Sequence, residues 1–157
     1  MKDGERDQLR TVADYQFGAG AGEALFPPDD EYDVSRSKTG RPVQIAVDDE
    51  RLVSVGTDGR FTLGLEGGRR LVAGLDHPAY RVVVGDESEP FVREGKNVFA
   101  KFVETVDPDV RPGDEVAVVH EDTEAVLAVG RAELDAQGIV EFDTGMAVKV
   151  REGAPDE

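Results

Sequence analysis

Short strand-like segments separated by tight turns are the feature that most restricts the fold of this chain. From residue 79 onward, runs of alternating or β-branched residues predict strands at 80–84, 89–92, 101–106, 115–120, 125–133 and 146–151. Pro108 and Pro112-Gly113 interrupt this series, and short helical turns are expected at 95–100 and 136–142. Many short strands with one or two short helices predict a small closed or nearly closed barrel.

The preceding residues predict a separate small α+β domain. An amphipathic helix is expected at 5–17, followed by a flexible glycine-rich connector at 18–22. Strands are expected at 32–36, 41–47, 51–55 and 60–65, and Asp58-Gly59 is a hairpin turn signal. His77-Pro78 reads as a boundary, which predicts domains at 1–78 and 79–153 and a disordered tail at 154–157. The predicted fold class is α+β, mostly β.

The chain carries a uniform excess of acid. Its 34 acidic and 18 basic residues give a formal net charge of −16, spread over both predicted domains. Only five of the basic residues are lysines, and cysteine and tryptophan are absent. This composition indicates a halophilic protein that works in molar salt, where the Debye length falls to about 3 Å and self-repulsion is screened. The alternative is an ordinary acidic protein, and unfolding at low salt separates the two.

Several classes of site and location are disfavoured by what the sequence lacks. Without cysteine there are no disulfides or thiolate ligands, and His77 and His120 lack ligand spacing, so neither a structural metal nor a cofactor is predicted. No apolar run approaches about 18 residues and the first residues are highly charged, so no membrane contact and a cytoplasmic location are expected. No constellation of residues indicates nucleophilic or acid–base catalysis, which predicts that the chain is not an enzyme.

Residues 91–103 gather cations and aromatic rings in this acidic chain. They hold Arg93, two of the five lysines and three phenylalanines. Gly95 permits a turn with positive φ, in which backbone N–H groups approach a phosphate. Lys96 and Lys101 are the cations that would neutralise phosphates beside it. This stretch is therefore the first candidate for a nucleic-acid contact.

Two further features extend or weaken that interpretation. An exposed Phe99 would stack a base for about 1–3 kcal/mol, but the favoured interpretation places Phe99 in the core and Phe102 facing away from Lys101. Lys149 and Arg151 alternate with valines, so both are candidates for one face of the last strand. They either extend the same groove or are simply solvated strand residues.

A second basic cluster lies in the predicted N-terminal domain. Arg36, Lys38 and Arg41 fall within six residues around an expected turn. They are predicted as a secondary RNA contact, and the competing interpretation is a solvated hairpin tip.

Four separated segments carry a resemblance to a known family. Residues 91–103, 111–116, 128–131 and 145–151 resemble, in order and spacing, the PUA domain, a small RNA-binding module of pseudouridine synthases and archaeosine transglycosylases. Residues 98–103 are most similar to the PUA domain that ends archaeal tRNA-guanine transglycosylases. Residues 13–18 and 35–41, with the Asp58-Gly59 hairpin, resemble the domain that precedes PUA in those enzymes. The resemblance implies a small α+β domain followed by a PUA-like pseudo-barrel.

The resemblance also implies a function. PUA domains grip the acceptor stem and the single-stranded 3′ end of tRNA with the glycine turn, the short helix, the following strand and the last strand. Carried onto this sequence, these elements give the predicted RNA-binding residues Arg93, Gly95, Lys96, Val98, Phe99, Lys101, Lys149 and Arg151.

The expected role is that of a non-catalytic tRNA-binding protein in tRNA modification. The catalytic barrel and the zinc site of the transglycosylases have no counterpart in this sequence. A tRNA-guanine transglycosylase or archaeosine synthase is the expected protein partner, and the acidic composition adds a haloarchaeal origin. The alternative function is a protein-interaction subunit, a scaffold for a tRNA-modifying enzyme in which RNA contact is incidental.

Overall fold

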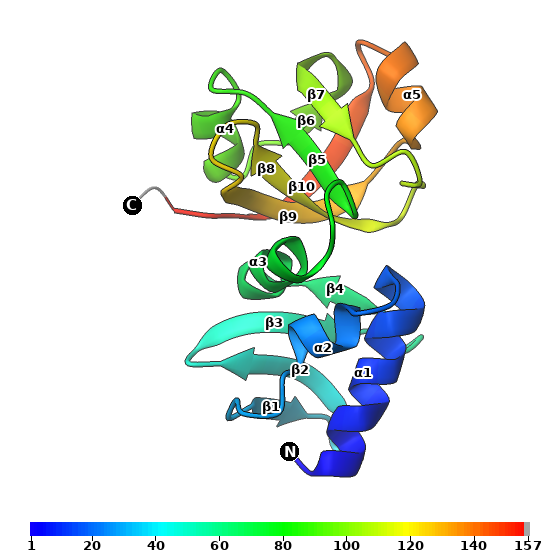
Figure 1. Cartoon of the computed structure of the whole chain (residues 1–157), viewed down its shortest axis with the longest axis vertical. Coiled ribbons are helices and arrows are strands. Elements are labelled where there is room, and N and C mark those ends of the chain that lie inside the picture. The colour runs from blue at the N-terminus through cyan, green and yellow to red at the C-terminus, as the bar shows by residue number, and fades with distance from the viewer. Residues whose placement is uncertain (156–157) are drawn as a thin grey trace. The chain divides into compact units, whose positions relative to one another are not determined.

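The computed structural model describes residues 1–155, which form two compact units (Figure 1). The first unit comprises Met1–Leu75, and the second begins at Asp76. Each unit has its own sheet. Among the described residues, no helix combines the length and the apolar character needed to cross a membrane.

The first unit is a four-stranded antiparallel sheet with three helices, in the sheet order β1-β2-β3-β4. Its strands are β1 (Asp33–Arg36), β2 (Pro42–Val47), β3 (Glu50–Val55) and β4 (Phe61–Leu63). Its helices are α1 (Asp3–Phe17), α2 (Ala21–Leu25) and α3 (Leu65–Gly74). The expected N-terminal helix and all four expected strands are confirmed, whereas α2 and α3 are additional.

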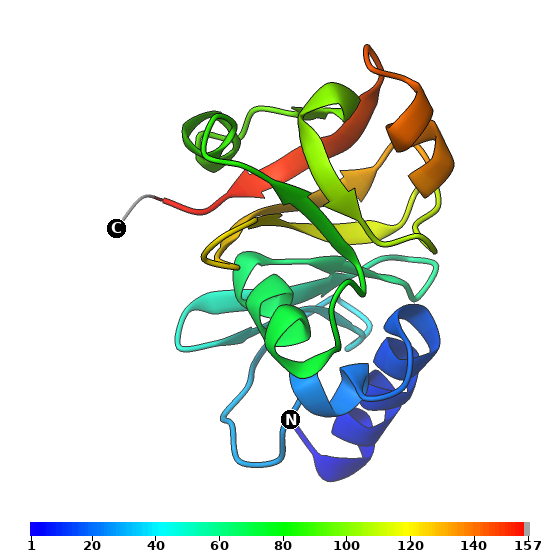
Figure 2. The ribbon, with the colours of Figure 1, turned by 45° about the horizontal axis from the view of Figure 1, so that its top comes forward.

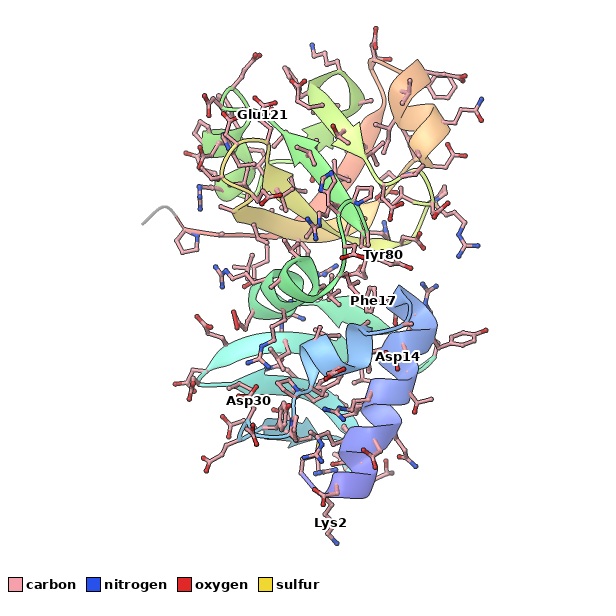
Figure 3. All side chains as sticks on the ribbon, in the orientation of Figure 1. Lys2, Asp14, Phe17, Asp30, Tyr80 and Glu121 are labelled. Carbon is pink, nitrogen blue, oxygen red and sulfur yellow. The ribbon has the colours of Figure 1, made fainter. Side chains whose placement is uncertain are left out.

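Helix α1 forms because its apolar residues recur on one face. Leu9, Ala13 and Phe17 are buried on that face. Asp14, labelled on α1 in Figure 3, accepts a hydrogen bond at 2.7 Å from the backbone nitrogen of Gly22. Asp14 therefore has a structural role, in which its side chain joins α1 to α2. The same bond shows that the expected flexible connector at 18–22 is wrong from residue 21, where α2 begins.

The hairpins of the first unit follow from turn chemistry. Asp48 and Asp49 have φ values of 52° and 65°, the left-handed pair that a two-residue turn between twisted antiparallel strands requires. Gly59 has a φ of 85°, and the Asp58 carboxylate accepts a hydrogen bond from the Arg60 backbone nitrogen at 3.0 Å. The predicted Asp58-Gly59 turn is confirmed.

The second unit is built on a six-stranded sheet with the order β6-β10-β9-β8-β5-β7. Its strands are β5 (Arg81–Val84), β6 (Val98–Phe99), β7 (Val103–Val106), β8 (Glu115–His120), β9 (Val126–Ala132) and β10 (Met146–Gly153). Two short α-helices, α4 (Glu89–Arg93) and α5 (Ala136–Glu141), and the 3-10 turn η1 (Ala100–Phe102) complete the unit. Strands β5 and β8 pair in parallel, and the other pairs are antiparallel.

The connection between the two edge strands makes this sheet a nearly closed barrel. Strands β6 and β7 lie at opposite ends of the sheet order, yet only the three residues of η1 separate them along the chain. Because three residues span only about 10 Å even when extended, the two edges must come together. Figure 2 shows the resulting curl of the sheet. The expected mostly-β fold class with a small barrel is confirmed.

Alternation along the strands fills the barrel. Val82 and Val84 of β5, Val116 and Val118 of β8 and Val148 of β10 all lie in one buried apolar cluster. Burying such side chains contributes roughly 1.5–3 kcal/mol each, which is enough to overcome weak local preferences. The barrel core therefore decides the register of the strands.

Three expectations for the second unit are wrong. Residues 89–92 form helix α4 rather than a strand, because Pro90 fits the first turn of a helix and Gly95 ends it. The expected helical turn at 95–100 is instead a turn followed by β6, and the helical turn lies at η1. Ala154, expected in a disordered tail, is 2% exposed and donates a hydrogen bond to the Leu127 carbonyl at 2.8 Å. Residues 156 and 157 of that expected tail lie outside the described residues.

Candidate nucleic-acid interface

The glycine turn after α4 is a helix cap of the Schellman type. The Gly95 backbone nitrogen donates to the Val92 carbonyl, and the Lys96 nitrogen donates to the Phe91 carbonyl, both at 3.0 Å. Gly95 has a φ of 95°, which the cap requires. Both N–H groups are therefore engaged within the helix end. The expected phosphate cradle made of backbone N–H groups at this turn is wrong, and the Lys96 side chain is what the turn presents.

Beside this turn lies a hollow of about 320 Å³ with three aromatic walls, called here the aromatic hollow. Phe91 is 58% exposed and Phe99 is 42% exposed, so neither ring belongs to the core. The favoured interpretation of Phe99 as a core residue is therefore wrong. The lining residues are Glu87, Ser88, Phe91, Val92, Lys96, Asn97, Val98, Phe99 and Phe102.

The residues that α4 and β6 bury decide that the neighbouring rings point outward. On α4, Val92 is 2% exposed and takes the core position, which leaves Phe91 on the outside. On β6, Val98 is buried and pairs with Val148 of β10, so the next residue, Phe99, points away from the barrel. One buried valine in each element thus fixes the neighbouring phenylalanine as a wall of the aromatic hollow.

A second hollow of about 560 Å³ adjoins the first and is acidic. The two share Glu87, Ser88 and Phe102. This acidic hollow is lined by Gly85, Asp86, Glu87, Ser88, Lys101, Phe102, Glu104 and Glu121. The Lys101 ammonium lies 5.1 Å from the centre of the Phe102 ring, a cation–π contact, so the expectation that these two side chains face opposite ways is wrong. Lys96 and Lys101 therefore line different hollows.

Two further predicted contact residues, Arg93 and Val98, are engaged in contacts within the PUA-like unit. Arg93 donates to the Glu89 carboxylate at 3.0 Å and to the Ala154 carbonyl at 3.4 Å, so it ties α4 to the C-terminal segment. Val98 is 2% exposed and serves the core.

The two candidates on β10 also differ from each other. Arg151 forms a two-pronged pair with Glu115, with one nitrogen–oxygen distance of 3.2 Å, and Glu115 is itself buried. Lys149 is exposed and has no ion pair among residues 1–155. Lys149 is therefore the cation of β10 that is available to a ligand.

The basic cluster of the first unit is mostly committed to internal contacts. Arg36 pairs with Glu5 at 2.7 Å, and this hydrogen bond lowers the pKa of the Glu5 carboxyl and raises the pKa of Arg36. Arg41 donates to the Gly56 carbonyl at 3.3 Å. Lys38 is exposed and forms no ion pair within the described part of the chain. Two of the three cations are thus held by contacts within the first unit, and a secondary RNA contact at this turn stays a prediction.

Comparisons with known families and structures decide what this fold is. Residues 80–154 match the profile of the PUA domain. Residues 7–78 match the patch-forming domain C2 of tRNA-guanine transglycosylase. The chain is a C2 domain followed by a PUA domain. The two matches together account for nearly all of the described residues.

Relatives of the same two-domain segment are archaeal. The chain is 47% identical over 150 residues to the tRNA-guanine(15) transglycosylase of Pyrococcus furiosus, a match that covers 95% of this chain and 25% of the relative. It is 48% identical over 148 residues to the enzyme of the same name from Methanothermobacter thermautotrophicus, with 94% and 22% covered. The chain thus spans about a quarter of the length of these relatives and corresponds to their C-terminal region.

Solved structures support the same fold at lower identity. A hypothetical protein from Pyrococcus horikoshii superposes with a TM-score of 0.76 at 24% identity, covering 100% of this chain and 94% of that one. A conserved PUA domain protein from Thermoplasma acidophilum gives a TM-score of 0.71 at 19% identity, with 100% and 93% covered. At these identities the likeness shows the fold alone.

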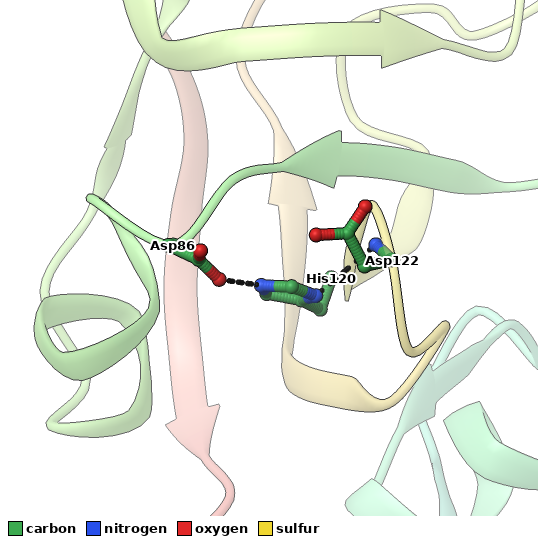
Figure 4. Close-up of side chains that lie close together, drawn as sticks. All are labelled: Asp86, His120 and Asp122. Carbon is green, nitrogen blue, oxygen red and sulfur yellow. Dashed lines mark hydrogen bonds and ion pairs between the residues drawn. The ribbon is translucent and has the colours of Figure 1, made fainter.

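One group in the PUA domain has the composition of a metal site. Asp86, His120 and Asp122 place their ligand atoms within 4.8 Å of one another (Figure 4). The His120 Nδ1 atom accepts hydrogen bonds from the backbone nitrogens of Asp122 and Thr123, at 3.1 and 3.3 Å. Nε2 must then carry the proton, which it donates to Asp86 at 2.5 Å. In this structure the three residues form a hydrogen-bonded cluster in which the Nε2 proton occupies the position that a metal would take.

Sequence reasoning missed two residues of the PUA surface. Phe91 was assigned to a strand end, although Pro90 before it and Gly95 after it are start and stop signals of a one-turn helix. Asn97 lines the aromatic hollow, and its side-chain oxygen accepts a hydrogen bond from the Val150 backbone nitrogen at 2.9 Å, which joins the glycine turn to β10. No local signal in the sequence indicates that second role.

Proposed function

We propose that this chain binds RNA, with an unpaired nucleotide of a tRNA held in the aromatic hollow of the PUA domain. The observation that carries the proposal is the pair of exposed rings, Phe91 and Phe99, that line one hollow together with Lys96. Base–aromatic stacking contributes about 1–3 kcal/mol per base and does not depend on which base is stacked. Lys96 supplies the positive charge for an adjoining phosphate, and Lys149 is the next phosphate contact.

The acidic hollow favours the end of a strand over its middle. It holds four carboxylates, from Asp86, Glu87, Glu104 and Glu121, against the single ammonium of Lys101. A strand that continued from the aromatic hollow into the acidic one would place a phosphate among these carboxylates, which repel it. A terminal nucleotide avoids that cost. This supports the unpaired 3′ end of a tRNA as the ligand, next to its acceptor stem.

The role we propose is a binding role within tRNA modification. The relatives are named as tRNA-guanine(15) transglycosylases, and the matching region supplies their C2 and PUA domains. The match lies within about a quarter of the length of these relatives, in their C-terminal region, which supports an accessory, non-catalytic role. A transglycosylase or archaeosine synthase is the proposed protein partner.

Fluorescence titration with tRNA tests the proposal in about 2 M KCl, where long-range repulsion is screened. Phe99→Ala is expected to weaken binding about tenfold, as loss of one stacked base predicts. Lys96→Glu is expected to weaken it similarly. Phe142→Ala is the matched control, because Phe142 is also an exposed ring, at 56%, but does not line the hollow.

Two results would overturn the proposal. One is equal affinity for intact tRNA and for tRNA that lacks its unpaired 3′ end. The other is equal affinity of the Phe99→Ala and Phe142→Ala variants for intact tRNA, because the ring in the hollow would then contribute nothing.

A second candidate function is a protein-interaction subunit for a tRNA-modifying enzyme. Val140 and Phe142, at the end of α5, are 74% and 56% exposed. Neither residue lines the aromatic hollow, and helices α4 and α5 lie on opposite sides of the barrel in both views (Figures 1 and 2). Capture of a transglycosylase that is resistant to ribonuclease and lost in Phe142→Ala would favour this function. Unchanged capture by Phe142→Ala would remove its support.

A further inference from the structure

His120 is a buried titratable residue that the proposed RNA contact does not use. It ends β8 and is 4% exposed. Its Nδ1 atom accepts hydrogen bonds from the turn at 121–124, and its Nε2–H group donates to Asp86 (Figure 4). One ring therefore joins two loops of the PUA domain, the turn between β8 and β9 and the loop between β5 and α4.

The loop that Asp86 occupies leads directly into the wall of the aromatic hollow. The next two residues, Glu87 and Ser88, both line that hollow. The Ser88 backbone nitrogen donates to the Gly85 carbonyl at 3.1 Å, and the Ser88 carbonyl accepts from Val92 at 3.0 Å. A displacement of Asp86 would thus be passed to the first turn of α4, which carries Phe91.

Helix α4 needs such an anchor because it is short. It has five residues, about one turn, and isolated helices of that length are not stable in water. Its C-terminal end is held by the Gly95 cap and by the bond from Arg93 to the Ala154 carbonyl. Its N-cap residue, Ser88, makes no side-chain capping bond. The bond between Asp86 and His120 lies two residues before that uncapped end.

We propose that His120 and Asp86 are positioning residues that hold the α4 wall of the aromatic hollow in its binding geometry. The effect on RNA affinity rests on the proposed function, whereas the effect on α4 does not. Because His120 also closes the turn at 121–124, the two roles of its ring must be separated by experiment.

Three substitutions separate these roles. Asp86→Ala removes the nearer acceptor for Nε2–H and leaves the Glu89 carboxylate, which lies 3.9 Å from Nε2. Asp86→Asn keeps a neutral acceptor of the same size and is the conservative rescue. His120→Asn places an amide oxygen close to the position of Nδ1, so it retains the acceptor for the turn but loses the bond to Asp86.

The first measurement is hydrogen exchange of the free protein, which needs no RNA. The backbone N–H groups of Val92, Gly95 and Lys96 report on α4 and its cap. Asp86→Ala and His120→Asn are expected to raise their exchange rates about tenfold, with the amides of β8 and β9 unchanged. Asp86→Asn is expected to resemble the wild type. Unchanged exchange in Asp86→Ala would overturn the proposal whatever the RNA result.

The second measurement is affinity for tRNA in the titration described above, where the sign of the change is decisive. If charge alone matters, removing a carboxylate beside a polyanion should leave the affinity unchanged in about 2 M KCl and tighten binding at lower salt. Loss of positioning should weaken it, so Asp86→Ala is expected to lose about fivefold in affinity while Asp86→Asn binds at least as well as the wild type. Unchanged or tighter binding by Asp86→Ala would overturn the positioning role. If the wild type fails to bind tRNA while the exchange result holds, the proposed function fails and the role of this pair in holding α4 stands.

Discussion

The half-buried phenol of Tyr32 is held by a hydrogen bond and a ring contact within the first unit. The Tyr32 hydroxyl donates to the Pro27 carbonyl, and its ring centre lies 6.1 Å from that of Phe26. Burial, together with the negative charge of Asp30, raises the pKa of Tyr32 to about 12. The neutral phenol is therefore the form that the fold stabilises.

The first prediction at this scale concerns alkaline pH. A raised folded pKa means that the contribution of Tyr32 is complete below the unfolded pKa of about 10 and is lost as pH rises through about 12. Tyr32→Phe should lower the free energy of unfolding by about 1 kcal/mol near neutral pH, through loss of the hydrogen bond. It should also reduce the decline in stability above pH 10. Urea denaturation across this range checks both effects.

Tyr15→Phe is the control for that measurement, because Tyr15 is 94% exposed. It should leave both the neutral-pH stability and the alkaline decline unchanged. If the stability of Tyr32→Phe declines as steeply as that of the wild type above pH 10, the Tyr32 phenol does not account for the alkaline instability.

At the same scale, the sequence predicted some residues well and others poorly. The positive φ at Gly95 was predictable, because it follows from local backbone chemistry. The exposure of Phe99 was not, because it depends on which of two neighbours the distant strand β10 draws inward. A one-residue shift in that pairing would have buried Phe99 and exposed Val98.

Among the elements, α3 shows how tertiary packing can hide a helix from sequence reasoning. Its segment contains Gly67 and Gly68, which lower helix propensity by about 1 kcal/mol each relative to alanine. A Cβ atom on Gly67 would lie 2.0 Å from the Leu52 carbonyl oxygen of β3. The close approach of helix and sheet thus requires glycine at this position. Because glycine has a low helix propensity, the sequence does not indicate a helix there.

This close approach yields the second prediction. Gly67→Ala should destabilise the protein by about 1–3 kcal/mol, even though alanine is the better helix former, because the clash with β3 is with backbone. Gly4→Ala in α1 is the matched control, since no atom lies within 4 Å of a Cβ there, and it should stabilise by up to about 1 kcal/mol. Thermal unfolding of both variants measures the difference. If Gly67→Ala stabilises the protein as much as Gly4→Ala does, the packing argument is contradicted.

Across the whole chain, the turn signals predicted a barrel but not which of its strands pair with each other. The positions of most strands were predictable from alternation and from glycine and proline punctuation. The sheet order was not, because β5 pairs with β8 in parallel across a long separation in sequence, and β6 pairs with the last strand. Such pairings are decided by burial of the valine cluster, which is a property of the assembled barrel.

The uniform acidity is also a property of the whole chain, and it leads to the third prediction. With a net charge of −16, self-repulsion should destabilise the fold at about 0.1 M KCl, where the Debye length is about 10 Å, and much less at about 2 M. The midpoint of thermal unfolding should therefore rise with KCl concentration.

A double substitution in one turn separates charge screening from other effects of salt on that midpoint. Asp48 and Asp49 are exposed and both have positive φ, which asparagine also tolerates, so changing both to asparagine removes two charges and keeps the turn. At low salt this variant should unfold a few degrees above the wild type, since 1 kcal/mol corresponds to roughly 2–4 °C in a protein of this size. In about 2 M KCl the gain should vanish, because the repulsion it relieves is already screened. If the variant gains equally at both concentrations, the change in unfolding midpoint comes from the turn and not from the charge. If the midpoint of the wild type does not depend on KCl, the acidity has no role in stability.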